Sequence, residues 1–303
     1  MEEVNFLTKR LRLFLYFIIL IYLFTACTTY QQNERPEEVE DPLEQEEVIS
    51  DTGPTRGGTI NLYVPHLDFI NPLFTKSKST AEVLGLVYNS MFTLDDQMNA
   101  LPCLVERWEV SPDGMTWTFY LRKDVKWHDH VQFTAKDIDF TFKMLSDNQY
   151  DSNYKYNIRH VSYFSVVDQF TFKVVLSKPY GNFLALMTFP IIPQHQLQGI
   201  DPLQISTDII PVGTGPYKIK EYEPYKQIML TVNPLWWGGE DIPYIDNVYI
   251  QVMKDNETAL FALEAKELDY VATDAVDWEK YIGKGDIQGK EYDTNKYEFL
   301  AVN

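Results

Sequence analysis

The stretch Pro211-Val212-Gly213-Thr214-Gly215-Pro216-Tyr217 guides the interpretation of the whole chain. Its prolines fix φ and push the preceding residues toward extended geometry, and its glycines allow positive φ or the close approach of another backbone or a ligand. We therefore predict a rigid bend with exposed main-chain N–H and C=O groups, followed by a strand over 217–222. The alternative is an ordinary strand-entry turn. A phosphate-binding loop is excluded, because neither GxxxxGK[ST] nor the third glycine of GxGxxG is present.

The composition is that of a folded, acidic protein. Its 303 residues suffice for about two domains, and a hydrophobic content of 45% excludes wholesale disorder. The net charge of −18 argues against a nucleic-acid partner, which would need a basic surface. Two cysteines, Cys27 and Cys103, give neither a disulfide framework nor a metal-binding spacing. Apolar neighbours predict that Cys103 is a buried packing residue rather than a reactive thiol.

The N-terminus predicts an export signal and a lipid anchor. Basic residues precede an apolar run over 13–24, which is shorter than the roughly 20 helical residues that span a bilayer and is typical of a signal peptide. Thr25 and Ala26 lead into Cys27, an order that resembles a bacterial lipobox. We expect residues 1–26 to be removed and Cys27 to be acylated; a short membrane anchor is the alternative. Residues 27–55 are polar and acidic, and we expect a disordered linker.

Alternation and capping signals predict a mixed α/β body. Strands are expected over 59–64, 117–121, 170–176, 217–222, 228–232, 248–252, 268–271 and from 297 to 302. Helices are expected over 81–91 with Thr80 as N-cap, from Thr134 to residue 145, and over 258–265. Residues 76–80 are expected to be extended and 147–163 to form a loop. Strands and helices do not strictly alternate, so we predict mixed sheets in at least two lobes.

Eight segments of the body, in this order, resemble the motifs of one family. They are Gly57–Ile60, Ile70–Pro72, Leu104–Gly114, Leu121–Asp129, Thr134–Ile138, Ser177–Tyr180, Pro211–Tyr217 and Asn233–Gly239. The family is extracellular solute-binding protein family 5, the peptide-, dipeptide- and nickel-binding lipoproteins of ABC importers. Two departures are His130, which replaces the glycine of an HDG turn, and Lys266, which replaces a glycine after a helix. Both positions favour left-handed backbone, which histidine tolerates better than most residues.

The resemblance implies a periplasmic-binding-protein-like type II cluster C fold, an α/β fold of two lobes hinged about a cleft. On that template, residues 57–88 and 186–299 form lobe one, and residues 89–185 form a domain inserted in it. Residues 300–303 would begin a second lobe that is truncated in this chain.

The resemblance also implies a function. The protein would capture an oligopeptide or dipeptide outside the cytoplasmic membrane and deliver it to ABC permease subunits, as a lipid-anchored monomer without a cofactor or enzymatic activity. The alternatives are a signalling co-receptor of the same fold, a binder of nickel or another solute, and a cell-surface hydrolase.

A cleft for peptides of varied sequence must hold their backbone. The resemblance places six ligand-binding residues at that cleft: Lys76, Ser77, Lys78, Gly213, Thr214 and Gly215. A solvated loop and a structural bend are the respective alternatives.

Other motifs carry no function in this interpretation. His128-Asp129-His130 would direct two imidazoles to the same side of a strand, as in a metal site, but no third ligand is evident. We interpret it as a surface turn of the inserted domain and expect no metal. No GxSxG nucleophile motif occurs. Trp236 and Trp237 are expected to pack beside a turn.

Overall fold

The computed structural model describes residues 53–203, 209–273 and 278–291. Cys27, the predicted signal peptide, most of the predicted linker and the strand expected over 297–302 lie outside these residues. The described residues belong to one compact unit. Within the described ranges, no helix has the length and apolar character needed to cross a membrane.

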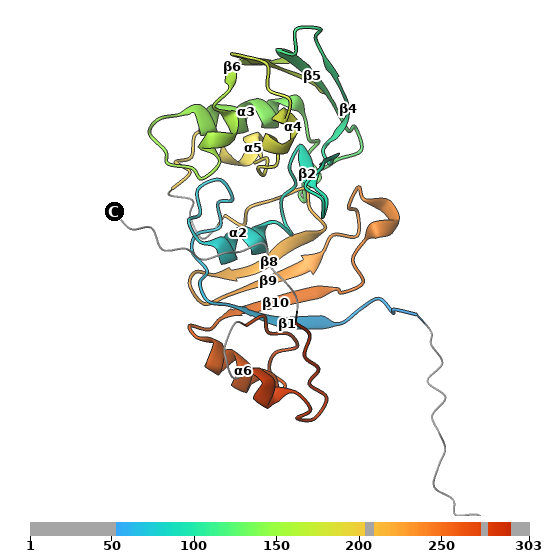
Figure 1. The fold of residues 1–303 in the computed structure, drawn as a ribbon, viewed down its shortest axis with the longest axis vertical. Coiled ribbons are helices and arrows are strands. Elements are labelled where there is room, and N and C mark those ends of the chain that lie inside the picture. Colours follow the sequence, from blue (N-terminus) through green and yellow to red (C-terminus); the bar gives the residue numbers. More distant parts are fainter. Residues whose placement is uncertain (1–52, 204–208, 274–277, 292–303) are drawn as a thin grey trace, which may run out of the picture. The chain divides into compact units, whose positions relative to one another are not determined.

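The first sheet has four strands in the order β1-β10-β9-β8 (Figure 1). These strands are β1 (Thr59–Val64), β10 (Asn247–Val252), β9 (Gln227–Val232) and β8 (Tyr217–Glu223). β1 pairs with β10 in parallel and the other neighbours are antiparallel, so the sheet is mixed. Alternation places Ile228 and Leu230 of β9 in the core, where both are fully buried. All four strands were predicted and are confirmed.

The second sheet is antiparallel throughout, in the order β4-β5-β7-β6. Its strands are β4 (Val105–Val110), β5 (Thr116–Leu121), β7 (Thr171–Leu176) and β6 (Val161–Asp168). Helix α3 (Ala135–Ser146) covers β6 and β7, and the rings of Phe142 and Phe172 lie 5.2 Å apart. The predicted start of α3 is confirmed: Thr134 and Asp137 form a reciprocal capping box.

Several elements differ from the sequence prediction. Strand β6 was not predicted, and its first residues were assigned to a loop, because bulges interrupt its pairing with β7 and blur the alternation. Also missed were the hairpin β2 (Phe92–Leu94) with β3 (Ala100–Pro102), the helices α4 (Phe183–Leu186) and α5 (Gln194–Leu197), and three 3₁₀ turns: η1 (Lys155–Ile158), η2 (Gly239–Asp241) and η3 (Trp278–Tyr281).

The strand expected over 268–271 is absent among the described residues. Helix α6 (Asn256–Glu264) ends before Lys266, whose φ of 61° confirms the left-handed backbone expected at that position. The chain then runs beside β1: Asp269 N donates to Asn61 O at 2.9 Å, but Asn61 N donates to the Asp269 carboxylate at 2.6 Å. The Asp269 carboxylate thus takes the place of a backbone carbonyl as acceptor, so the hydrogen-bond pattern of a β-strand does not continue.

Helix α2 (Lys78–Leu84) begins earlier and ends earlier than predicted. Ser77, not Thr80, is its N-cap, and the Ser77 hydroxyl accepts from Thr80 N at 3.1 Å. The Thr80 hydroxyl instead accepts from Asp68 N at 3.0 Å. The prediction of extended chain over 76–80 is therefore wrong from Lys78 onward.

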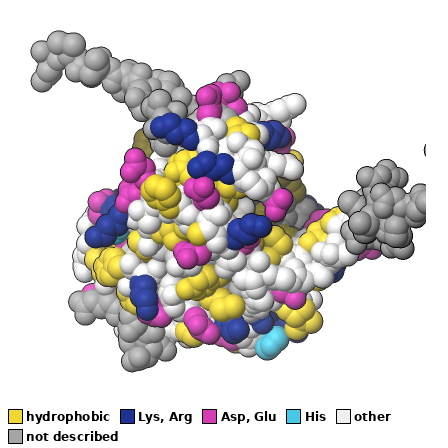
Figure 2. All heavy atoms as spheres, turned by 90° about the horizontal axis from the view of Figure 1, so that it is seen from below, with side chains coloured by type: hydrophobic (Ala, Val, Ile, Leu, Met, Phe, Trp, Pro, Cys, Tyr) yellow, Lys and Arg dark blue, Asp and Glu magenta, His cyan; other side chains and the backbone are white. Residues whose placement is uncertain are grey.

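The strands of the first sheet all come from the ranges predicted for lobe one, and those of the second sheet all come from the predicted inserted domain. Most buried apolar residues nevertheless form one core that includes members of both sheets, and Ala259, Ala262 and Leu268 form a second, small cluster. The boundaries between lobe one and the inserted domain therefore remain a prediction. On the face drawn in Figure 2, acidic and basic side chains are interspersed, so that face offers no single-sign field.

Candidate ligand-binding site

The bend at 211–217 lies inside the molecule and not at its surface. Gly213 and Gly215 are buried, and Thr214 has an exposed fraction of 0%. Gly215 N donates to Val87 O at 2.8 Å, and Tyr217 N donates to Leu86 O at 3.1 Å. The prediction of exposed main-chain groups is wrong here, because the segment that follows α2 uses them.

The two glycines are required by this close approach. A Cβ on Gly213 would lie 1.9 Å from Val87 O, and a Cβ on Gly215 would lie 2.6 Å from Leu86 O. Neither glycine has a positive φ. The sequence suggested two reasons for glycine here, a positive φ or the absence of a side chain. The bend requires the second.

His128 also contacts the bend, with both its backbone and its ring. Its backbone N donates to Gly213 O at 2.9 Å, Gly213 N donates to His128 Nδ1 at 3.0 Å, and His128 Nε2 lies 3.1 Å from Gly215 O. Because Nδ1 accepts a hydrogen bond, the ring is neutral with its proton on Nε2, which donates to Gly215 O. Burial lowers the pKa of His128 to about 4, which keeps the ring neutral.

The interpretation of residues 128–130 as a surface turn is thus wrong for His128, which is a structural residue. His130 has a φ of 71°, so the left-handed turn expected there is confirmed. Among the described residues, no group of three or more His, Cys, Asp or Glu side chains is arranged to hold a metal ion.

Asn89 and Trp237 complete the surroundings of the bend. The Thr214 hydroxyl donates to Asn89 Oδ1 at 3.1 Å. Trp237 Nε1 donates to Thr214 O at 3.1 Å and lies 3.3 Å from Asn89 Oδ1. Trp237 therefore packs beside the bend, as expected, and fixes it with a polar contact.

The residues Lys76, Ser77 and Lys78 are accessible, unlike the bend. Lys76 Nζ lies 3.0 Å from Asp151 Oδ2 and is half exposed. The Lys78 side chain is 88% exposed and lies 3.5 Å from Glu82. Exposed pairs of this kind contribute little to stability, so both ammonium groups can be redirected to a ligand at small cost.

Asp68 positions this segment, and the sequence prediction missed it. Its carboxylate accepts from the Thr75 hydroxyl at 2.6 Å and from Lys76 N at 3.3 Å, while its carbonyl accepts from the Tyr222 hydroxyl at 2.8 Å. The available signal was a single aspartate within an apolar stretch, which is a buried charge that needs partners.

The structure does not bring the two groups of predicted residues together. Ser77 caps the start of α2, whereas the bend contacts the chain beyond the end of α2. Seven helical residues span about 10 Å at 1.5 Å per residue. The two groups thus flank a helix and do not share one contact surface.

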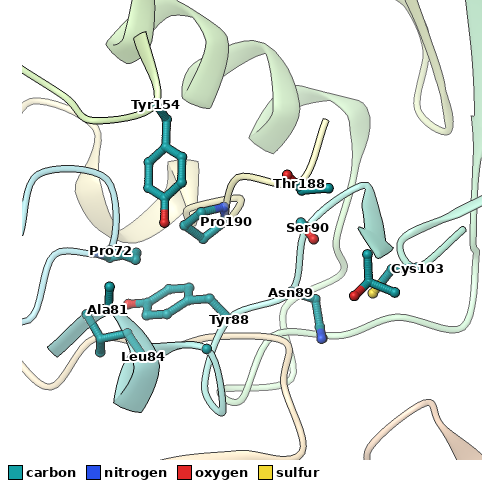
Figure 3. Close-up of a pocket in the computed structure, with 12 residues that line it drawn as sticks. Pro72, Ala81, Leu84, Tyr88, Asn89, Ser90, Cys103, Tyr154, Thr188 and Pro190 are labelled. Carbon is teal, nitrogen blue, oxygen red and sulfur yellow. The ribbon is translucent and has the colours of Figure 1, made fainter. Parts of the chain in front are cut away.

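A cavity of about 340 Å³ lies between α2, residues 88–90 and residues 188–190 (Figure 3). Rings and aliphatic groups form much of its wall, among them Pro72, Leu84, Tyr88, Tyr154 and Pro190. The sequence prediction missed Tyr88 as a cavity residue, because a helix was expected to continue to residue 91.

Cys103 lies at the opposite end of the cavity from Pro72 (Figure 3). Burial raises the pKa of its thiol to about 11. At neutral pH the thiol is therefore protonated, which fits the packing role expected for Cys103.

Comparison with known proteins gives consistent matches. The family model described as bacterial extracellular solute-binding proteins, family 5 Middle, matches residues 99–303. A Brucella ovis protein, named for peptide binding in an ABC transporter, is 28% identical over 222 residues, which cover 71% of this chain and 42% of that protein. The dipeptide-binding protein of Escherichia coli is 29% identical over 222 residues, covering 65% of this chain and 41% of that protein.

A comparison with solved structures agrees with these sequence matches. The structure of the oligopeptide-binding protein AppA from Bacillus subtilis, in complex with a nonapeptide, matches with a TM-score of 0.70 and 22% identity, over 77% of this chain and 47% of that one. The chain spans about two fifths of the length of the curated relatives. The fold, the ordered motifs and the match over residues 99–303 confirm the resemblance: the chain belongs to the bacterial extracellular solute-binding proteins of family 5.

Proposed function

We propose that this protein captures peptides outside the cytoplasmic membrane and delivers them to the permease subunits of an ABC importer. The observation that carries the proposal is the family membership together with relatives named for peptide and dipeptide binding. We further propose that the protein acts as a monomer and is not an enzyme. A signalling co-receptor and a binder of another solute are the competing functions. Loss of labelled-peptide uptake on deletion of the gene would favour the importer over the co-receptor.

The anchor is the second part of the proposal. A basic segment, an apolar run and small residues precede Cys27, so we expect lipid on Cys27 and removal of residues 1–26. The acidic stretch that follows would repel itself and hold the folded body away from the membrane. Mass spectrometry of protein from its native membrane should show a diacylated or triacylated Cys27 at the N-terminus. An intact Met1 or an unmodified Cys27 would refute the anchor.

Within the site, we propose that Lys76, Ser77 and Lys78 contact the solute directly. Lys76 and Lys78 are accessible, and Asp68 and the Ser77 cap fix the backbone around them. For Gly213, Thr214 and Gly215 we propose an indirect part: their polar groups are engaged within the chain, and they position the segment after α2.

If the protein recognises a peptide through the peptide backbone, removal of either lysine side chain should change the binding affinity only slightly. Lys76→Ala and Lys78→Ala should each weaken peptide binding by less than tenfold, which corresponds to about 1.4 kcal/mol. Titration calorimetry of the full-length protein with a mixed peptide pool measures this, and Lys136→Ala on the exposed side of α3 is the matched control. A loss of much more than tenfold would show that a lysine charge, and not the peptide backbone, dominates recognition. No binding of any peptide would overturn the proposed function itself.

A further inference from the structure

The Tyr88 hydroxyl is the unusual group in the cavity beside α2. Tyr88 is 4% exposed, and its oxygen has no hydrogen-bond partner among the described residues. Two other hydroxyls at the wall have partners: Ser90 donates to Phe92 O, and Thr188 donates to Ala185 O at 3.2 Å. A buried polar group without a partner is costly, so natural proteins rarely keep one without a use.

The wall of the cavity suits an uncharged group. None of its described wall residues carries a charge. Figure 3 shows the rings of Tyr88, Tyr154, Pro72 and Pro190 around the space, with the Tyr154 hydroxyl pointing toward Tyr88. Its volume of about 340 Å³ is near the lower end of small-molecule sites, which begin at roughly 300 Å³. It therefore suits one ring-sized group and not a whole oligopeptide.

Burial also keeps the Tyr88 hydroxyl protonated, since it raises the pKa of that group far above its usual range. The hydroxyl is thus a permanent hydrogen-bond donor that can also accept. A ring that enters the cavity with a polar tip would provide the missing partner, whereas a charged tip would lose its hydration without meeting an opposite charge.

We propose that this cavity binds an uncharged aromatic ring with a polar tip, such as a tyrosine side chain of a bound peptide, and that Tyr88 is its specificity-determining residue. The peptide source of the ring rests on the proposed function. The cavity itself does not, because its volume, its uncharged wall and the unpartnered hydroxyl are properties of the described residues alone.

The test uses small probes that do not depend on peptide binding. The full-length protein and its Tyr88→Phe variant are titrated with 4-methylphenol, toluene and 4-methylbenzoate by ligand-observed NMR. In the wild type, 4-methylphenol should bind about fivefold more tightly than toluene, as expected for one hydrogen bond, and 4-methylbenzoate should not compete. In Tyr88→Phe this preference should disappear.

Two further variants control the experiment. Tyr154→Phe, which removes the hydroxyl of a less buried ring at the same cavity, should keep the preference for 4-methylphenol. Ala81→Phe, which fills the space from α2, should abolish binding of all probes. Tyr88→Phe should fold with an unchanged or higher melting temperature, because it removes an unpaired buried hydroxyl.

The outcomes separate the two proposals. Equal affinity for 4-methylphenol in the wild type and Tyr88→Phe, or tight binding of 4-methylbenzoate, would overturn the cavity proposal. Binding of 4-methylphenol without binding of the peptide Ala-Tyr-Ala would support the cavity and contradict the proposed peptide function. Binding of Ala-Tyr-Ala that is unaffected by Tyr88→Phe would show that the cavity does not receive the peptide side chain.

Discussion

Alanine at Gly213 or Gly215 should destabilise the protein by about 3 kcal/mol or more, at the upper end of the usual cost of overpacking. The reason is the backbone of residues 86–87, which leaves no room for a methyl group at either position. Backbone atoms cannot rotate away as a flexible side chain would, so the two chains would have to separate. Separation would break the hydrogen bond from Gly215 N to Val87 O and weaken those made by His128.

Urea unfolding followed by tryptophan fluorescence measures this loss. Gly181→Ala is the matched control, because Gly181 is exposed, lacks a positive φ and would place its Cβ where no atom lies within 4 Å. We expect Gly181→Ala to change the free energy of unfolding by less than about 0.5 kcal/mol. If all three variants had the same stability, the bend would not be a close-packed junction.

His128 should make stability depend on pH in the acid range. Its pKa is about 4 in the folded protein and about 6.5 in an unfolded chain. Between these values the unfolded chain binds more protons, so the free energy of unfolding rises with pH. The stabilisation is complete above about pH 6.5 and is lost as the pH falls toward 4, with an amplitude of about 1–3 kcal/mol.

The change His128→Gln isolates this effect from the titration of other groups. Glutamine can still accept from Gly213 N and donate to Gly215 O, but it does not titrate. The difference in unfolding free energy between wild type and variant, measured in urea at pH 7.0 and pH 4.5, should shrink at the lower pH. Parallel stability curves for the two proteins would contradict the assignment of a buried neutral imidazole.

Local signals in the sequence predicted most of the sheet strands. Alternation in β9 and β10 corresponds directly to burial on one face, and the Thr134 capping box begins α3 where expected. These features depend on neighbouring residues, so a single sequence contains them. α2 differed because its N-cap Ser77 and the buried Thr80 are both good capping residues, and only the contact from Asp68 to Thr80 distinguishes them.

The candidate site was less predictable, because its contacts join distant parts of the chain. The glycines of the bend were identified, but their partner at residues 86–87 lies more than one hundred residues earlier. His128 was recognised as unusual and assigned to a surface turn, since nothing nearby in sequence indicates that its ring meets Gly213 and Gly215. The isolated hydroxyl of Tyr88 depends on packing from several segments and has no local signal.

The central claim is that this member of family 5 carries peptides. Native mass spectrometry of the full-length protein, purified from its own organism without denaturation, tests it most directly, because tightly bound solute remains on the protein. The account predicts additional mass that tandem fragmentation resolves into short peptides, and that exchanges when a peptide pool is added. A bound metal ion, sugar or amino-acid conjugate that peptides do not displace would contradict it.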